Sequence, residues 1–194
     1  MAKKRIFSLD AETNGLYGQA FSVGAVVVDD NEFSDIGEVA RFVGRCPIEE
    51  DIDPWVEENV LPQMREIVEN YSSYEQLLSA FIAFYKEHVL VEGEWGPTPD
   101  AGVDVIVHCG CPVEARLFID AVEMGLLGTF EGPLPLKDVG TLPGIGASVD
   151  GYNAEHEIAP DQAEFAGGTH NPLYDSAAAA AAYIHWMQAH GFGR

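Results

Sequence analysis

The sequence predicts one α/β domain, built on a central mixed five-stranded sheet with helices on its flanks. The chain has 194 residues, of which 47% are hydrophobic and 22% are charged, as is typical of a globular domain. Three strand patterns follow one another at the start, and two further strands then alternate with helical patterns. This order favours three antiparallel strands followed by two parallel strands.

The first three strands are expected to form an antiparallel meander. Residues 5–10 alternate in polarity and run into a turn at Gly15, residues 21–28 form a β-branched apolar run, and residues 39–44 supply the third strand. Glycine suits this turn because it adopts a positive φ without strain. The short connections favour neighbouring antiparallel strands.

Two helical patterns follow the meander. Pro54 opens the first with Asp53 as its N-cap, and Pro62 is expected to kink or split it. The apolar side of this helix is predicted to contain Trp55, Val56, Val60, Met64, Ile67 and Val68. Ser73 and Gln76 predict a capping box for the second helix. Its predicted core face contains Leu77, Leu78, Phe81, Phe84 and Tyr85.

The middle of the chain is predicted to hold a loop, a buried strand, a helix and a weak strand. Residues 92–102 contain two prolines and are expected to be a loop. Residues 103–109 are nearly all apolar, which indicates a strand buried on both faces. Pro112 opens the next helix, and residues 134–139 are the weak fifth strand.

The last third of the chain combines a long loop with a long helix. Residues 140–169 are rich in glycine and acidic residues, and a loop of this length is usually functional or mobile. A short helix is expected within it at residues 160–165. The final helix is expected over residues 172–189, where the alanine run 177–182 favours helix and close packing on a sheet.

The charge balance limits the kind of partner. The chain has ten basic and 32 acidic residues, a formal net charge of −22. This charge repels nucleic acid at long range. A broad groove that tracks phosphates needs clustered Lys and Arg and is therefore disfavoured. A compact site in which bound cations supply the positive charge stays compatible. The few basic residues that could reach upstream phosphates are Arg41, Arg45, Arg116 and Lys137.

Localisation is expected to be cytoplasmic, with no membrane partner. No apolar run reaches the roughly 20 residues that a membrane helix needs, and no signal-peptide core follows the basic start. The chain has three cysteines, Cys46, Cys109 and Cys111. Three is a small and odd number, so they cannot all pair with one another, and a disulfide framework is not expected. Cys109 and Cys111 beside His108 raise the alternative of zinc, but strand alternation separates His108 from both, and packed thiols are favoured.

Acidic residues from three elements form the candidate site. Asp10 and Glu12 lie two apart at the end of the first strand, so their side chains leave the same face. Two carboxylates this close repel unless a cation lies between them, and Mg²⁺ or Mn²⁺ suits oxygen ligands. Glu114 lies in the first turn of a helix, and Asp175 follows His170 as the last helix begins. Taken alone, Asp10 and Glu12 would also fit a solvated strand end.

Together these residues resemble the motifs of the DEDDh family of 3′→5′ exonucleases, the DnaQ-like or RNase T-like group with an RNase H-like fold. The first family motif, Asp-x-Glu-Thr-x-Gly-Leu, matches Asp10, Glu12, Thr13, Gly15 and Leu16. The third motif, His-x-x-x-x-Asp, matches His170 and Asp175. The second motif departs from the family: its His-Asn and following Asp are here His108, Cys109 and Glu114. The resemblance extends in element order from Arg5 to His190.

The resemblance implies one exonuclease domain over residues 1–194 that uses a two-metal mechanism. Two Mg²⁺ or Mn²⁺ ions would bind Asp10, Glu12, Glu114 and Asp175; one would activate water and the other would stabilise the leaving 3′ oxygen. His170 would be the general base. The terminal nucleotide would bind Thr13, Asn14, Gly15, Leu16 and His108. The products would be nucleoside 5′-monophosphates, and the loop 140–169 would lie near the active site.

Several alternatives stay open. Glu114, longer than the family's Asp, either reaches the same metal from a slightly retreated helix, or holds the second metal loosely, or marks an inactive site. Asp120 is its rival but lies nearly two turns further along the helix, and Asp104 lies at the far end of its strand. The expected partner is a single-stranded 3′ end, with RNA slightly favoured over DNA. An inactive binding module and a proofreading-type subunit are the alternative functions; homodimers are common in the family, although no segment indicates an interface.

Overall fold

The structure is a computed structural model that describes residues 4–30, 37–110, 112–146, 148–165 and 167–191. A five-stranded sheet has the order β3-β2-β1-β6-β7. The first three strands pair antiparallel, whereas β1, β6 and β7 run parallel. The predicted mixed sheet is therefore confirmed. Its strands are β1 (Lys4–Thr13), β2 (Ala20–Asp30), β3 (Gly37–Arg45), β6 (Val103–Val107) and β7 (Leu136–Asp138).

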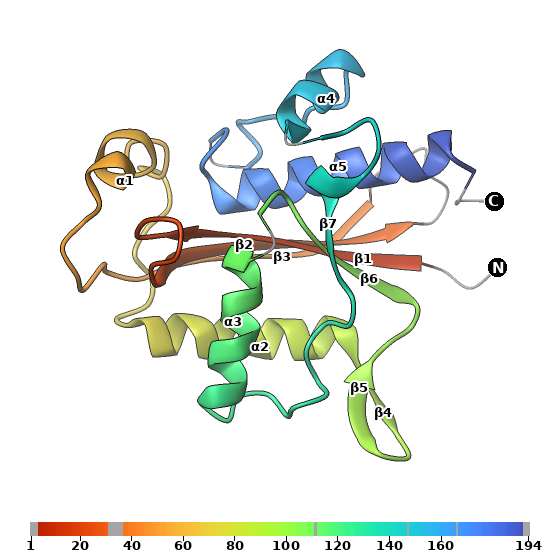
Figure 1. The fold of residues 1–194 in the computed structure, drawn as a ribbon, viewed down its shortest axis with the longest axis horizontal. Helices are drawn as coiled ribbons and strands as arrows, with labels where there is room; N and C mark the ends of the chain where they lie inside the picture. Colours follow the sequence, from red (N-terminus) through yellow and green to blue (C-terminus); the bar gives the residue numbers. More distant parts are fainter. Residues whose placement is uncertain (1–3, 31–36, 111, 147, 166, 192–194) are drawn as a thin grey trace.

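Helices cover both faces of this sheet (Figure 1). One face carries α4 and α5, and the other carries α2 and α3, while α1 lies beyond the carboxyl end of β1. A short 3-10 turn, η1 (Val139–Thr141), follows β7. The helices are α1 (Pro54–Asn59), α2 (Tyr74–Val89), α3 (Pro112–Glu123), α4 (Val149–Glu155) and α5 (Pro172–Ala189). None of the helices in the described part of the chain is both long and apolar enough to cross a membrane.

The side chains of β1 point alternately to the two faces of the sheet, and each face has its own hydrophobic core. Phe7 and Leu9 belong to the core beneath α2 and α3, whereas Ile6 belongs to the core beneath α5. Because alternate residues share a face, Ser8 and Asp10 lie on the α5 side of the sheet. The alanine run of α5 is fully buried, so this helix can lie close to the strands.

The first helix is shorter than the sequence predicts. α1 ends at Asn59, and residues 60–66 continue as turns. Val56, Val60, Met64 and Ile67 are buried as expected, but Trp55 and Val68 are 56% and 75% exposed. The expectation for these two residues was wrong: Val68 lies beyond the end of the helix, so the helical period no longer places it, and Trp55 lies within α1 but outside its buried side, where Val56 is the buried residue.

Residues 90–99 form a hairpin rather than the predicted loop. β4 (Leu90–Gly93) pairs antiparallel with β5 (Gly96–Pro99). Prolines suggest a loop because they lack a backbone donor, but a two-stranded ribbon tolerates them where that donor would face solvent. Gly96 has φ +94 at the turn.

The segment 140–169 contains a helix, but not at the predicted place. Residues 162–165 form a turn, whereas α4 begins after Ser148, whose hydroxyl accepts a hydrogen bond from the N–H of Gly151 at 3.2 Å. The strand before the second motif also ends two residues earlier than predicted, at Val107. Cys111 lies outside the described residues.

Candidate active site

Asp10 lies where two parallel strands stop pairing. The β1–β6 register ends at Leu9 and Val107, so Asp10 and His108 both follow at the carboxyl edge of the sheet. Asp10 is only 6% exposed, and Glu12, two residues on, is half-buried. The first strand therefore directs two carboxylates to one face of this edge.

The start of α5 is fixed directly on the strands opposite Asp10. Gly24 is the β2 partner of Asp10, and a Cβ atom on Gly24 would lie 2.2 Å from the carbonyl carbon of Pro172. The Ser8 hydroxyl donates to the Ser176 carbonyl at 2.7 Å, and Ser176 Oγ lies 3.0 Å from the Gly24 carbonyl oxygen. This close approach brings Asp175, in the first turn of α5, to the two carboxylates of β1.

Asp10, Glu12 and Asp175 form one group. One carboxylate oxygen from each lies within 4.8 Å of the others. Asp175 is 4% exposed, and its Oδ1 has no hydrogen-bond partner in the described structure. Buried polar atoms are normally paired, so this arrangement fits a bound cation.

Glu114 is the acidic residue of α3 that reaches the same site. It is 1% exposed, and its Oε2 is buried without a hydrogen-bond partner among the described residues. Asp120 instead accepts from the Tyr74 hydroxyl at 2.6 Å and pairs with Arg116. Asp104 pairs with Lys137 and Tyr183. The carboxylates of Asp120 and Asp104 therefore bind other side chains and not this site.

These side chains line one cavity of about 490 Å³. Apart from Asn14, every predicted site residue takes part in the lining: Asp10, Glu12, Thr13, Gly15, Leu16, His108, Glu114, His170 and Asp175. Among the described residues, no lysine or arginine lines this cavity. The structure therefore brings together the three sequence motifs, which are far apart in the chain.

Asn14 supports the cavity wall instead of lining it. Its Nδ2 donates to the Asp51 carbonyl at 3.0 Å, and its Oδ1 accepts from the Asp53 N–H at 2.8 Å. Next to it, the Thr13 hydroxyl donates to the Gly15 carbonyl at 2.7 Å, and Gly15 has φ +79. The turn that contains the first motif is thus attached to the segment before α1.

His170 occupies a constrained position at the cavity. It has φ +65, and its N–H donates to Asp175 Oδ2 at 3.0 Å. The side chain of Asn171 caps α5 by accepting from the N–H groups of Leu173 and Tyr174. The His170 ring meets the Trp55 ring edge-on, with centroids 5.5 Å apart.

Burial and mutual repulsion make the carboxylates of this site hard to ionise. Burial, followed by the charges of neighbouring carboxylates, raises the pKa of Asp10 and of Asp175. Burial raises the pKa of Glu12 to about 7 and that of Glu114 to about 8. Burial lowers the pKa of His108. A cation bound among these groups would offset the repulsion between their negative charges and would favour their ionised forms.

Sequence reasoning missed three residues near the site. Asp53 was assigned only as a helix cap and Trp55 only to an apolar face, yet both line the cavity. Asp150, in the first turn of α4, lies beside His108 and Asp175. Ser148, two residues before Asp150, was the available signal for a helix start, because serine is a favoured N-cap.

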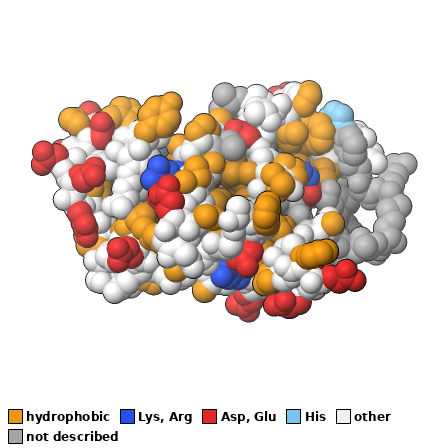
Figure 2. Space-filling model, turned by 60° about the horizontal axis from the view of Figure 1, so that its bottom comes forward, with side chains coloured by type: hydrophobic (Ala, Val, Ile, Leu, Met, Phe, Trp, Pro, Cys, Tyr) orange, Lys and Arg blue, Asp and Glu red, His pale blue; other side chains and the backbone are white. Residues whose placement is uncertain are grey.

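The basic residues considered for upstream phosphates pair with acidic side chains. Arg41 lies near Glu164, Arg45 near Glu69, Arg116 near Asp120 and Lys137 near Asp104. Figure 2 shows the same imbalance on one face, where acidic side chains are scattered and Lys or Arg are few.

No protein-family model matches the sequence, and no curated protein is significantly similar to it. Among solved structures, the chain is similar to exonuclease X in complex with 5′-overhanging duplex DNA, with a TM-score of 0.57 and 17% sequence identity. The similarity covers 96% of this chain and 92% of that chain. At this identity it establishes the architecture: the sheet and its flanking helices form the expected RNase H-like fold.

Proposed function

We propose that this protein is a divalent-metal-dependent 3′→5′ exonuclease that releases nucleoside 5′-monophosphates. The observation that carries the proposal is the convergence of Asp10, Glu12, Glu114 and Asp175 with His170 on one cavity. The motif resemblance and the similarity in fold to an exonuclease support it.

The four carboxylates would hold two Mg²⁺ or Mn²⁺ ions. The unpartnered oxygens of Glu114 and Asp175 are suited to this because carboxylates are preferred ligands of hard cations. When bound, the ions would supply the positive charge that the phosphodiester, the attacking water and the leaving 3′ oxygen require. The chain must therefore hold its own carboxylates close together, and the packing of α5 on Gly24 supports this by fixing the start of the helix that carries Asp175.

His170 would take the proton from the attacking water. An imidazole suits this role because its ordinary pKa lies close to neutrality. The hydrogen bond from its N–H to Asp175 fixes its backbone beside the carboxylates, and Trp55 limits the space that its ring can occupy.

The substrate would be the 3′ end of a single-stranded or short nucleic acid, with RNA slightly favoured over DNA. Leu16 and Trp55 line the cavity yet are 65% and 56% exposed, so the indole of Trp55 could stack on an unpaired base and Leu16 could pack against one. The backbone of Thr13 to Gly15 would approach the terminal nucleotide. Because Arg41, Arg45, Arg116 and Lys137 pair with acidic side chains, the protein would bind only a few nucleotides.

The test uses 5′-labelled single-stranded RNA and DNA of one sequence, with Mg²⁺, Mn²⁺ or EDTA. We expect a ladder that shortens from the 3′ end only with metal, and nucleoside 5′-monophosphates as products. Asp10→Asn should reduce the rate roughly 10³-fold, because the metal contributes several kcal/mol to the barrier. Glu58→Gln, at an exposed acidic residue of α1, is the control and should keep the wild-type rate.

The direction of shortening identifies the polarity, and the faster strand identifies the preferred sugar. Absence of a ladder on both strands with every metal would contradict the proposal and favour a non-catalytic binding module. A ladder that persists in Asp10→Asn would indicate a contaminating nuclease.

A further inference from the structure

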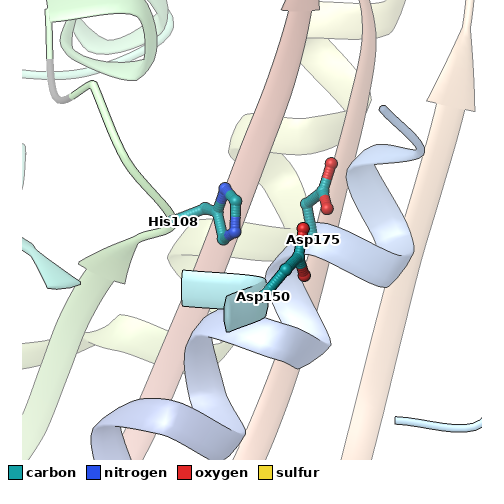
Figure 3. A group of neighbouring side chains, drawn as sticks. All are labelled: His108, Asp150 and Asp175. Atoms are coloured by element: carbon teal, nitrogen blue, oxygen red, sulfur yellow. The ribbon is translucent and has the colours of Figure 1, made fainter. Parts of the chain in front are cut away.

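A second group of possible metal ligands lies beside the acidic site. One atom each from His108, Asp150 and Asp175 lies within 4.8 Å of the others. The three residues come from the end of β6, the first turn of α4 and the first turn of α5, and their side chains face one another (Figure 3). Asp175 belongs both to this group and to the group with Asp10 and Glu12.

The polar atoms of this second group lack partners. His108 Nε2, Asp150 Oδ1 and Asp175 Oδ1 are all buried, and none has a hydrogen-bond partner among the described residues. Asp175 itself is 4% exposed. Three such atoms from three separate elements are unusual in a folded protein, and the proximity of the three side chains indicates a missing ligand between them.

The charges of the group indicate what that ligand is. Asp150 and Asp175 are carboxylates at close range, and no lysine or arginine pairs with either of them within the described residues. The Asp150 carboxylate accepts one hydrogen bond, from the Thr169 hydroxyl at 3.0 Å, which leaves its negative charge in place. A small cation would satisfy all three orphaned atoms together.

We propose that His108, Asp150 and Asp175 form an additional divalent-cation site that shares Asp175 with the Asp10–Glu12 group. The site should prefer Mn²⁺ to Mg²⁺, because one of its three donors is an imidazole nitrogen and Mg²⁺ favours oxygen ligands. The inference deepens the proposed metal-dependent function, on which it rests for the role of Asp175, but it concerns ion binding that is measurable without substrate.

The first experiment measures Mn²⁺ binding by the loss of the free-ion signal in electron paramagnetic resonance. The variant Asp10→Asn/Glu12→Gln removes both strand carboxylates and should keep one bound Mn²⁺. Adding Asp150→Asn or His108→Gln to that variant should weaken the remaining site at least about tenfold. Mg²⁺ should compete poorly for it.

The matched control is Glu155→Gln, because Glu155 is an exposed acidic residue of the same helix α4. It should leave Mn²⁺ binding unchanged. Asp150→Asn keeps the shape of the side chain and an oxygen that can accept from Thr169, so we expect it to fold. His108→Gln provides an independent test of the same site.

A second experiment locates the ion by proton NMR. His108→Gln identifies the ring resonances of His108 among the six histidines of the chain. Small amounts of Mn²⁺ added to Asp10→Asn/Glu12→Gln should broaden the His108 signals more than those of His190, which follows the far end of α5.

Three results would overturn the inference. The first is that adding Asp150→Asn to Asp10→Asn/Glu12→Gln leaves Mn²⁺ binding as tight as before. The second is that Asp10→Asn/Glu12→Gln itself loses all binding, and the third is that the His108 signals stay sharp. Each would mean that His108, Asp150 and Asp175 do not hold an ion independently of the β1 carboxylates. A metal-dependent 3′ ladder seen together with one of these results would leave the proposed exonuclease standing, whereas no metal binding to the wild-type protein would remove both.

Discussion

Glu114 and Asp120 lie six residues apart on α3, yet their carboxylates have different surroundings. Glu114 faces the cavity with an unpartnered oxygen, whereas Asp120 is bonded to Tyr74 and Arg116. Glutamate differs from aspartate by one methylene, and at this position the longer side chain still reaches the cavity. The departure from the family's second motif is thus compatible with a working site.

Glu114→Gln should therefore reduce exonuclease turnover at least about 100-fold, since it removes a proposed metal ligand. Asp120→Asn should keep turnover within about threefold and cost only about 1 kcal/mol of unfolding free energy, through its weakened hydrogen bonds. Single-turnover rates and urea unfolding measure the two effects. Glu123→Gln, whose side chain is 66% exposed, is the surface control. If Asp120→Asn were the inactive variant, Glu114 would be the wrong acid.

Trp55 is the residue most suited to contact a substrate base. It is 56% exposed, lines the cavity and meets the ring of His170. Trp55→Ala should raise KM about tenfold, because stacking on one base contributes roughly 1–3 kcal/mol. Steady-state kinetics on a short single strand would measure this. Trp95→Ala, at the 94% exposed tip of the hairpin, should not change KM; equal effects of both would argue against stacking.

Among the elements, α5 depends on the absence of a side chain at Gly24. A Cβ atom there would lie 2.2 Å from the Pro172 carbonyl carbon, so the helix would have to move away from β2. Gly24→Ala should cost about 3 kcal/mol of unfolding free energy, and turnover should fall because Asp175 moves with α5. Urea unfolding and kinetics measure both effects.

The control for this substitution is Gly132→Ala, where a new Cβ would meet nothing within 4 Å. It should change stability by no more than about 0.5 kcal/mol. If Gly24→Ala unfolded at the same urea concentration as Gly132→Ala, the backbone contact would not determine the position of α5.

Elements that depend on neighbouring residues could be predicted from the sequence, whereas contacts between residues far apart in the chain could not. Local signals were sufficient for the cap at Asp53, the start of α3 at Pro112 and the whole of α5. The hairpin was missed because the prolines of β5 hide its strand pattern. Asp150 was missed because no local pattern relates it to His108, from which it is separated by 42 positions; only the packing of α4 on α5 brings them together.

For the whole molecule, the acidic site makes stability depend on pH. The pKa of Glu12 is raised from 4.5 to about 7 and that of Glu114 from 4.5 to about 8, mainly by burial. The folded protein therefore keeps protons that the unfolded chain releases. This contribution to folding is complete below about pH 4.5 and is lost as the pH rises toward about 8.

Without metal, the Tm should consequently fall by about 5 °C or more between pH 5 and pH 8. Mn²⁺ or Mg²⁺ should raise the Tm more at pH 8 than at pH 5, because ionised carboxylates bind the ion. Thermal unfolding followed by circular dichroism measures both. Glu114→Gln should flatten the metal-free profile, and an unchanged slope in that variant would contradict the assignment.

The hydrogen bonds of Asn14 have a consequence for how the cavity adapts to its contents. They join the turn at residues 13–18 to the segment that caps α1, so Leu16 and Trp55 lie on connected parts of one cavity wall. If the proposed function holds, a nucleotide with a bulkier base or sugar would not be accommodated by moving one of them alone. The adjustment would then fall to residues 167–170, which adjoin this wall through the contact of His170 with Trp55, and where Gly167 has φ +139 and His170 has φ +65. Substrate size would then be read by the same short segment that carries the proposed base.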